Sequence, residues 1–138
     1  MAANIADDAT ILDDWRLLRR IPSQPGIYIV WDENRQIWKI SSQAFKNHRD
    51  NPLAMSVHIE RVLLDAGLTY QAVIQDAKRF ALAGFAAHVA RANAQTVTRE
   101  PLPGDPAHAH VNGQKPKRVQ ESIRDAAVWV VPPPVPTD

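Results

Sequence analysis

Turn-forming residues divide this chain into short segments, and that division limits the folds it can adopt. The 138 residues include 11 prolines and 5 glycines. These and other turn signals separate the apolar segments at Pro22, Gly26, Pro52, Gly67, Pro101 and the pair Asn112-Gly113. The most apolar window, 80–90, contains a histidine and is about half as long as a bilayer requires. The sequence therefore predicts short strands and helices, with no membrane span.

Composition places the chain among ordinary globular domains. A length of 138 residues allows one domain. Hydrophobic residues make up 45% and charged residues 22%, which is typical of a folded domain. Sixteen basic and fifteen acidic residues give a net charge of +1, so the overall charge does not support a nucleic-acid or membrane partner. The absence of cysteine excludes disulfides, thiolate metal sites and cysteine nucleophiles.

The two ends of the chain differ in composition from the segment between them. Residues 1–9 are small and acidic without periodicity, and we expect a disordered tail. They lack the basic start and apolar stretch of a signal peptide, so a cytoplasmic protein, bacterial in style, is expected. Residues 132–138 contain four prolines and predict an extended tail whose deletion leaves folding intact. The domain is therefore predicted to span 10–131.

The first apolar segment of the domain has helical spacing. Ile11, Trp15 and Leu18 recur at i, i+4 and i+7, which predicts a helix over 11–20 that Pro22 ends. The remaining elements follow the turn signals. Strands are expected over 27–31, 36–40, 54–57, 79–85, 96–100, 107–111 and 127–131, and short helices over 43–47, 59–66, 69–74, 88–93 and 116–126.

These elements predict a single α+β domain. We expect a mostly antiparallel sheet of about five strands with helices packed on it. The alternative is a sheet with a central parallel pair, formed by the last strand–helix–strand unit and joined by a right-handed crossover. The segments 54–60 and 79–93 remain open between strand and helix, because periodicity alone does not separate the two states in short apolar runs.

A pair of histidines is the clearest chemical feature. The segment 105–111 reads Asp-Pro-Ala-His-Ala-His-Val. Side chains alternate between the faces of a strand, so His108 and His110 share one face and Asp105 lies nearby. Imidazoles exchange protons and bind transition metals near neutral pH. The motif therefore indicates an acid–base or ligand site, although two exposed histidines on a half-solvated strand would have the same sequence.

A basic turn follows the histidine pair. Lys115, Lys117 and Arg118 stand where a turn leads into a helix that begins near Pro116. Free N–H groups at a helix start, together with cations, favour anions such as phosphate. We therefore expect Lys115, Lys117, Arg118 and Asp105 to bind a ligand next to the histidine pair, unless the turn is only a solvated basic segment.

Other polar residues depend on the secondary structure around them. If 54–60 is a strand, Ser56, His58 and Glu60 share a face; if it is a helix, they do not. His88 is expected to be a half-buried core residue, and His48 lies in a polar loop without an expected role. No third ligand has the spacing of a standard zinc site, and glycine-rich cofactor motifs are absent, so neither a metal nor a cofactor is expected.

Two classes of function remain compatible with these features. The first is a cytoplasmic binding or accessory protein that acts through a protein partner or a phosphate-containing anion. The alternative is a small enzyme that processes a phosphoester or nucleotide with His108 and His110 as catalytic residues. A cleft with His108 at its floor would favour the enzyme, and a flat surface would favour the binding protein. The sequence does not identify the ligand, the partner or the oligomeric state.

Overall fold

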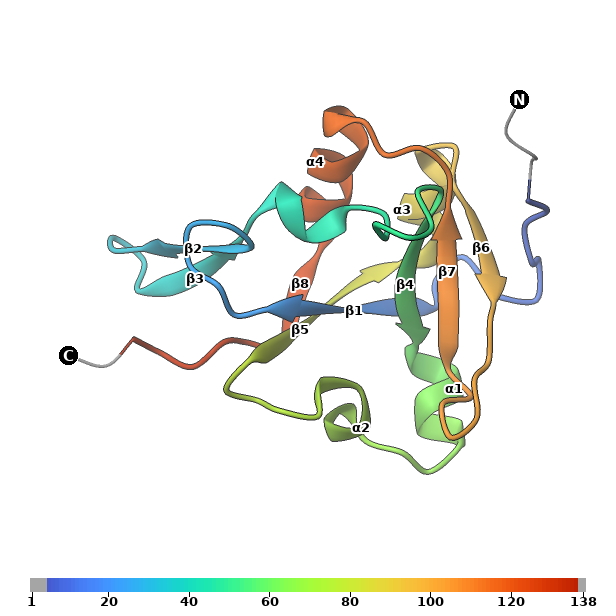
Figure 1. The fold of residues 1–138 in the computed structure, drawn as a ribbon, viewed down its shortest axis with the longest axis horizontal. Coiled ribbons are helices and arrows are strands. Elements are labelled where there is room, and N and C mark those ends of the chain that lie inside the picture. Colours follow the sequence, from blue (N-terminus) through green and yellow to red (C-terminus); the bar gives the residue numbers. More distant parts are fainter. Residues whose placement is uncertain (1–4, 137–138) are drawn as a thin grey trace.

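The computed structural model describes residues 5–136, and its main element is an antiparallel sheet of six strands (Figure 1). The order across the sheet is β6-β7-β4-β1-β5-β8, and every neighbouring pair is antiparallel. The strands are β1 (Arg16–Pro22), β4 (Ala54–Ile59), β5 (Phe80–Ala86), β6 (Thr96–Arg99), β7 (His108–Asn112) and β8 (Val128–Val131). The predicted α+β class is confirmed. The alternative with a parallel pair does not occur in the described residues, because β7 and β8 lie on opposite sides of the sheet centre.

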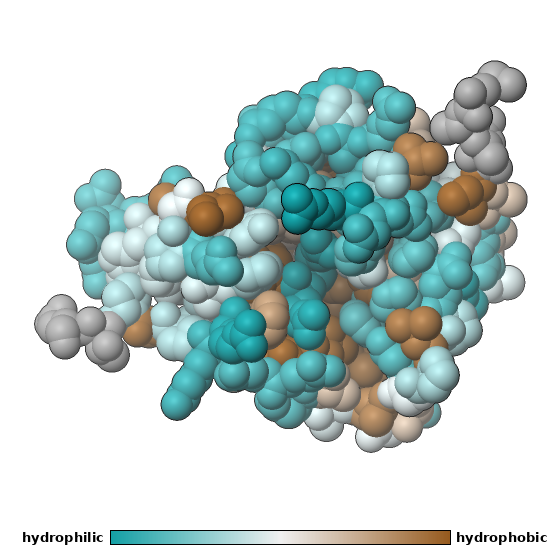
Figure 2. Space-filling view, viewed as in Figure 1, coloured by the Kyte–Doolittle hydropathy of each residue, from teal (hydrophilic) through white to brown (hydrophobic). Residues whose placement is uncertain are grey.

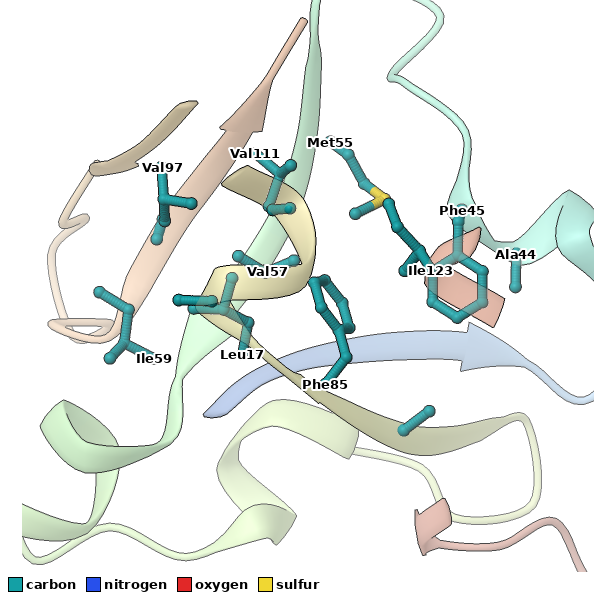
Figure 3. Close-up of a cluster of buried hydrophobic side chains, with 14 of the residues drawn as sticks. Leu17, Ala44, Phe45, Met55, Val57, Ile59, Phe85, Val97, Val111 and Ile123 are labelled. Atoms are coloured by element: carbon teal, nitrogen blue, oxygen red, sulfur yellow. The ribbon is translucent and has the colours of Figure 1, made fainter. Parts of the chain in front are cut away.

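The larger hydrophobic core covers one face of the sheet. It is closed by the 3-10 helix η1 (Ser42–Phe45), by α3 (Ala87–Ala92) and by α4 (Lys117–Ala126). Figure 3 shows side chains from the sheet and from these helices meeting in this core. Among those below 2% exposure are Phe45, Met55, Val57, Val111 and Ile123. Burial of this apolar surface is the main force that holds the helices on the sheet.

The second, smaller core lies on the opposite face. Two short helices, α1 (Glu60–Asp65) and α2 (Tyr70–Ile74), pack there. The buried side chains of this core are Leu18, Leu63, Val73, Ile74, Leu82 and Ala107. These residues come from β1, β5 and the two helices, together with the residue that precedes β7. The part of this face over β4 and β7 therefore carries polar side chains.

The first strand replaces the helix expected over 11–20. Adjacent residues Leu17 and Leu18 are both 0% exposed, because β1 lies inside the sheet and has a core on each face. A strand buried on both faces loses the alternation of apolar and polar residues that identifies a strand. The helical spacing of Ile11, Trp15 and Leu18 is therefore coincidental, and that prediction was wrong.

The first strand also separates from β4 along its length. Two residue pairs join β1 to β4, whereas seven join β1 to β5, and Figure 1 shows β1 crossing β4 at a steep angle. The Arg19 side chain bridges the two strands where they separate, and its Nη1 donates a 2.9 Å hydrogen bond to the Ser56 carbonyl. This divergence places a charged side chain inside the sheet layer.

A separate hairpin extends from one side of the molecule. It consists of β2 (Ile29–Asp32) and β3 (Ile37–Ile40), as the sequence predicts, and the C-terminal segment runs beside it (Figure 1). Pro133 is buried, and the Trp38 indole Nε1 donates a 2.8 Å hydrogen bond to the Pro134 carbonyl. Trp129 Nε1 donates in turn to the Trp38 carbonyl at 2.8 Å. The described part of the tail is therefore in contact with the domain.

The N-terminal segment is attached to the other side of the sheet. The guanidinium of Arg91 pairs with the carboxylates of Asp7 and Asp13, and Arg99 pairs with Asp8. The Asp7 carboxylate also accepts a 2.8 Å hydrogen bond from the Val97 backbone N–H. The part of the expected tail that the structure describes, residues 5–9, therefore contacts α3 and β6, while residues 1–4 lie outside the described residues.

Candidate functional site

The four polar side chains of the candidate site come from two paired strands. In the register of β4 and β7, Ser56 lies opposite His110 and His58 lies opposite His108. The intervening residue Val57 is buried in the larger core, so these four side chains all lie on the other face. The ring centroid of His108 is 5.5 Å from that of His58 and 5.3 Å from that of His110. The strand alternative is therefore correct for 54–59, whereas Glu60 already belongs to α1.

A hydrogen-bond network runs from a backbone carbonyl through His108 to Ser56. The His108 Nδ1 lies 2.8 Å from the Glu100 carbonyl oxygen, which only accepts, so this nitrogen carries the proton. The other ring nitrogen, Nε2, then accepts from the Ser56 hydroxyl at 3.1 Å. The Nε2 of His48 lies 2.5 Å from the same hydroxyl oxygen. In the tautomer with the proton on Nδ1, the other nitrogen of His108 is directed at Ser56.

The neighbouring imidazole is paired with a carboxylate. His58 Nε2 lies 3.0 Å from Asp105 Oδ2, and the side chain of His58 is 15% exposed. Burial lowers the pKa of His58, and Asp105 opposes this shift without reversing it. Burial is also the main cause that lowers the pKa values of His48 and His110. These three rings therefore favour the neutral form, in which one ring nitrogen can act as a base.

Two arginines from β1 supply positive charge at this site. Nε of Arg19 donates to the Ala44 carbonyl at 3.0 Å, in addition to the bond to Ser56 already described, and burial lowers the Arg19 pKa to about 10. The guanidinium of Arg20 lies 4.3 Å from the centre of the Phe80 ring. No carboxylate of residues 5–136 lies within ion-pair distance of either arginine. Their charges are therefore not neutralised locally.

These side chains line one cavity, which we call the histidine pocket. Its volume is about 390 Å³. The polar wall includes Gln75 in addition to Arg19, Arg20, His48, Ser56, His58 and His108, and Asp105 is the one carboxylate among the described lining residues. The apolar wall comes from α2 and the start of β5, through Ala72, Val73 and Phe80. The face drawn in Figure 2 is mostly hydrophilic, with hydrophobic side chains visible in a hollow near its centre.

The basic turn lies apart from this pocket. The Lys115 ammonium donates to the side-chain oxygen of Asn47 and to the carbonyls of Val111 and Gly113, and Lys115 is 8% exposed. The Lys117 ammonium donates to the Ser42 hydroxyl at 2.7 Å. None of Lys115, Lys117 and Arg118 lines the histidine pocket, whereas Lys115 lines a neighbouring open cavity that also includes His48. The expected juxtaposition with His108 is therefore not present.

Some of the other residues predicted from the sequence lie in the pocket and others lie outside it. His108 and Asp105 line the pocket, whereas His110 lies beside it, with its Nδ1 4.0 Å from the Glu100 carboxylate. Glu60 begins α1 and pairs with Arg16 instead of joining the site. His88, expected to be half-buried in the core, is exposed on α3. The site therefore contains one histidine of the predicted pair, together with the strand residues that the sequence left open.

Sequence reasoning missed three residues of the pocket. Arg19 and Arg20 lie in the segment that the sequence predicted as a helix. Their place in the pocket depends on this segment being strand β1 instead. The sequence placed His48 in a polar loop and expected no role for it. The loop is correct, but the His48 ring contacts the hydroxyl of Ser56, eight residues further along the chain. No local pattern signals this contact, because it depends on how the loop folds back onto β4.

Similarity to known proteins does not indicate a function for this chain. No protein family, curated protein or solved structure matches this chain. Among residues 5–136, no group of three or more His, Cys, Asp or Glu side chains is arranged to hold a metal ion. Within the same range, no helix has the length and apolar character needed to cross a bilayer. The functional argument therefore rests on the histidine pocket itself.

Proposed function

We propose that this protein binds a small phosphate-containing ligand in the histidine pocket. The observation that carries the proposal is the pair Arg19 and Arg20, which line the pocket without a carboxylate partner among the described residues. Guanidinium groups present several N–H donors in a planar arrangement that suits phosphate oxygens. The N–H groups of His58 and His108 already donate to Asp105 and to the Glu100 carbonyl, so the imidazoles beside the arginines add no negative charge but leave the anion to the guanidinium groups.

The dimensions and the apolar wall indicate more than a free phosphate ion. A volume of about 390 Å³ falls within the range of about 300–1,000 Å³ typical of small-molecule pockets. Val73 and Phe80 form an apolar surface opposite the polar one. A phosphate ester of an organic group, such as a nucleotide, would place its phosphate on the arginines and its organic part on this apolar wall. This ligand class is our proposal for the natural one.

The proposal predicts that phosphate compounds stabilise the protein through Arg20. We expect inorganic phosphate or a nucleoside 5′-monophosphate to raise the melting temperature of the wild type above that in chloride of equal ionic strength. At a concentration one hundred times the dissociation constant, a ligand adds about 2.7 kcal/mol to the free energy of unfolding. Arg20→Gln should abolish most of the shift, because it removes an exposed guanidinium that lines the pocket. Differential scanning fluorimetry measures both effects.

Arg79→Gln is the matched control. The guanidinium of Arg79 also lies against the Phe80 ring, at 5.4 Å, but Arg79 does not line the pocket. We expect this variant to keep the full shift. A double variant, Lys117→Gln with Arg118→Gln, tests the basic turn that the sequence favours. Loss of the shift in the double variant, with Arg20→Gln unaffected, would move the anion site to that turn and contradict the proposal.

A second candidate function is phosphoester processing in the same pocket. The hydrogen bonds of His58 to Asp105 and of His108 to the Glu100 carbonyl and Ser56 favour it. An imidazole that is held in one tautomer by its second nitrogen is an arrangement suited to general acid–base catalysis. A binding protein that only retains an anion has no need for this arrangement. His108→Ala should then leave phosphate binding largely in place and remove turnover.

A further inference from the structure

The Ser56 hydroxyl lies at the centre of the pocket's hydrogen-bond network. Its proton is directed at the Nε2 of His108, 3.1 Å away. With the hydroxyl proton placed toward His108, the same oxygen accepts from His48 Nε2. One lone pair of the Ser56 oxygen is then left without a hydrogen bond. The Ser56 oxygen therefore has His108 as an adjacent base and keeps one lone pair that is not hydrogen-bonded.

The arrangement is that of an activated nucleophile. A serine hydroxyl is weakly nucleophilic unless an adjacent base accepts its proton, and a third group must orient that base. Here His108 is the base and the backbone carbonyl of Glu100 is the orienting group, at 2.8 Å from Nδ1. We infer that Ser56 is the nucleophile in the hydrolysis of phosphate monoesters, through a phosphoserine formed at this position. The inference rests on the proposed ligand site, and it adds a reaction and an intermediate to it.

The first step transfers the phosphoryl group to the serine. The Ser56 oxygen attacks phosphorus and its proton passes to His108 Nε2, while the bond between phosphorus and the ester oxygen breaks. The departing oxygen lies opposite the serine in this in-line displacement, so it takes its proton from solvent and leaves as an alcohol, while His108 remains protonated. The products are the alcohol and phosphoserine, and no electrons are gained or lost. Arg19 and Arg20 lie in the same pocket, where they offset the charge on the phosphoryl oxygens.

The second step returns the enzyme to its initial state. A water molecule attacks the phosphorus of phosphoserine from the side opposite the serine and releases its proton to solvent. The bond to the serine oxygen then breaks, and that oxygen recovers the proton from His108. The sum of both steps is a phosphate monoester and water giving an alcohol and inorganic phosphate. His58, paired with Asp105, has its ring 5.5 Å from that of His108 and forms the adjacent wall of the site.

The test uses the full-length protein with p-nitrophenyl phosphate and with adenosine 5′-monophosphate. We expect release of inorganic phosphate from at least one of them. After acid quenching, intact mass spectrometry should show the addition of one phosphoryl group, and peptide mapping should place it on Ser56. Ser56→Ala should lose both the release and the added mass. The thermal shift of this variant with inorganic phosphate, which depends mainly on the two arginines, shows whether it still folds and binds.

Ser122→Ala is the matched control, since that hydroxyl also accepts a side-chain hydrogen bond, from Asn93 at 2.9 Å, but does not line the pocket. It should hydrolyse both esters at the wild-type rate. Full hydrolysis by Ser56→Ala would overturn the serine mechanism. Absence of hydrolysis and of label in the wild type, with the phosphate shift retained, would overturn the inference and leave the binding function. Absence of the phosphate shift as well would remove the proposed function itself.

Discussion

At the scale of single residues, burial controls the charge of the imidazoles. His48, His58 and His110 each have a pKa below the ordinary value of 6.5, and burial is the largest cause in every case. Asp105 beside His58 and Glu100 near His110 act in the opposite direction. Of the rings that line the pocket, His48 and His58 therefore favour the neutral form near pH 7, and the positive charge of the pocket comes from the arginines.

These shifts predict that the protein loses stability in mild acid. Below about pH 6.5 the three rings bind protons in the unfolded chain more readily than in the folded one, so the unfolded state is favoured. Each unit of pKa difference is worth about 1.4 kcal/mol. The free energy of unfolding should therefore fall as the pH drops through 6.5 and stay level just above it. Urea denaturation at about pH 5 and about pH 7.5 measures the difference.

His58→Gln should reduce this pH dependence, because it removes the most buried of the three shifted rings. His88→Gln is the control, since His88 is exposed on α3, and it should leave the pH dependence unchanged. A free energy of unfolding that is the same at both pH values in the wild type would contradict the assignment of neutral rings.

At the scale of elements, the C-terminal segment behaves as part of the hairpin. Pro133 is buried and the Trp38 indole donates to the Pro134 carbonyl, so removal of residues 132–138 exposes apolar surface and leaves a donor unpaired. We expect the truncated chain to fold with a free energy of unfolding lower by about 1–2 kcal/mol. Chemical denaturation of both chains measures the loss. This expectation keeps the sequence-based prediction that the deletion leaves folding intact and adds a loss of stability to it.

Trp38→Phe separates the two contributions to tail binding. It keeps an aromatic ring against the segment but removes the indole N–H, so we expect a smaller loss than truncation gives. Equal stability of the truncated and full-length chains would show that the segment contributes nothing to folding. The edge-to-face contact of Trp38 with Trp31, at 5.0 Å between ring centroids, is within the hairpin and should survive truncation.

The elements that the sequence predicted well have clear local signals. Ser41 caps η1 by accepting from the Gln43 N–H, as a serine before a helix indicates. The alternation in 107–111 correctly places His108 and His110 on one face, opposite the buried Val111. The prediction for β1 was wrong because this strand is buried on both faces. Its sequence therefore lacks the alternation of apolar and polar residues that identifies a strand. Because this strand was predicted as a helix, the sequence did not place Arg19 and Arg20 in the pocket. Their position there depends on the tertiary structure.

At the scale of the whole molecule, one face of the sheet packs the larger core and the other face carries the smaller core and the histidine pocket. The larger core, between the sheet and α3, α4 and η1, holds the fold together. The smaller core positions α2, which supplies the apolar wall of the histidine pocket. A polar site on one half of a face is compatible with a stable sheet only because the other face is closed by helices.

Two neighbouring residues of β1 test this division, because they are equally buried but face different cores. Leu17 packs in the larger core and Leu18 in the smaller one, and both are 0% exposed. Leu17→Ala and Leu18→Ala should each lower the free energy of unfolding by about 2–5 kcal/mol. Only Leu18→Ala should also weaken phosphate binding, since the cavity it leaves lies beneath Val73 and Ile74 of α2. Urea denaturation and calorimetric titration with inorganic phosphate, below the melting temperature of both variants, measure the two effects. Equal affinity in both variants would show that the pocket does not depend on the smaller core.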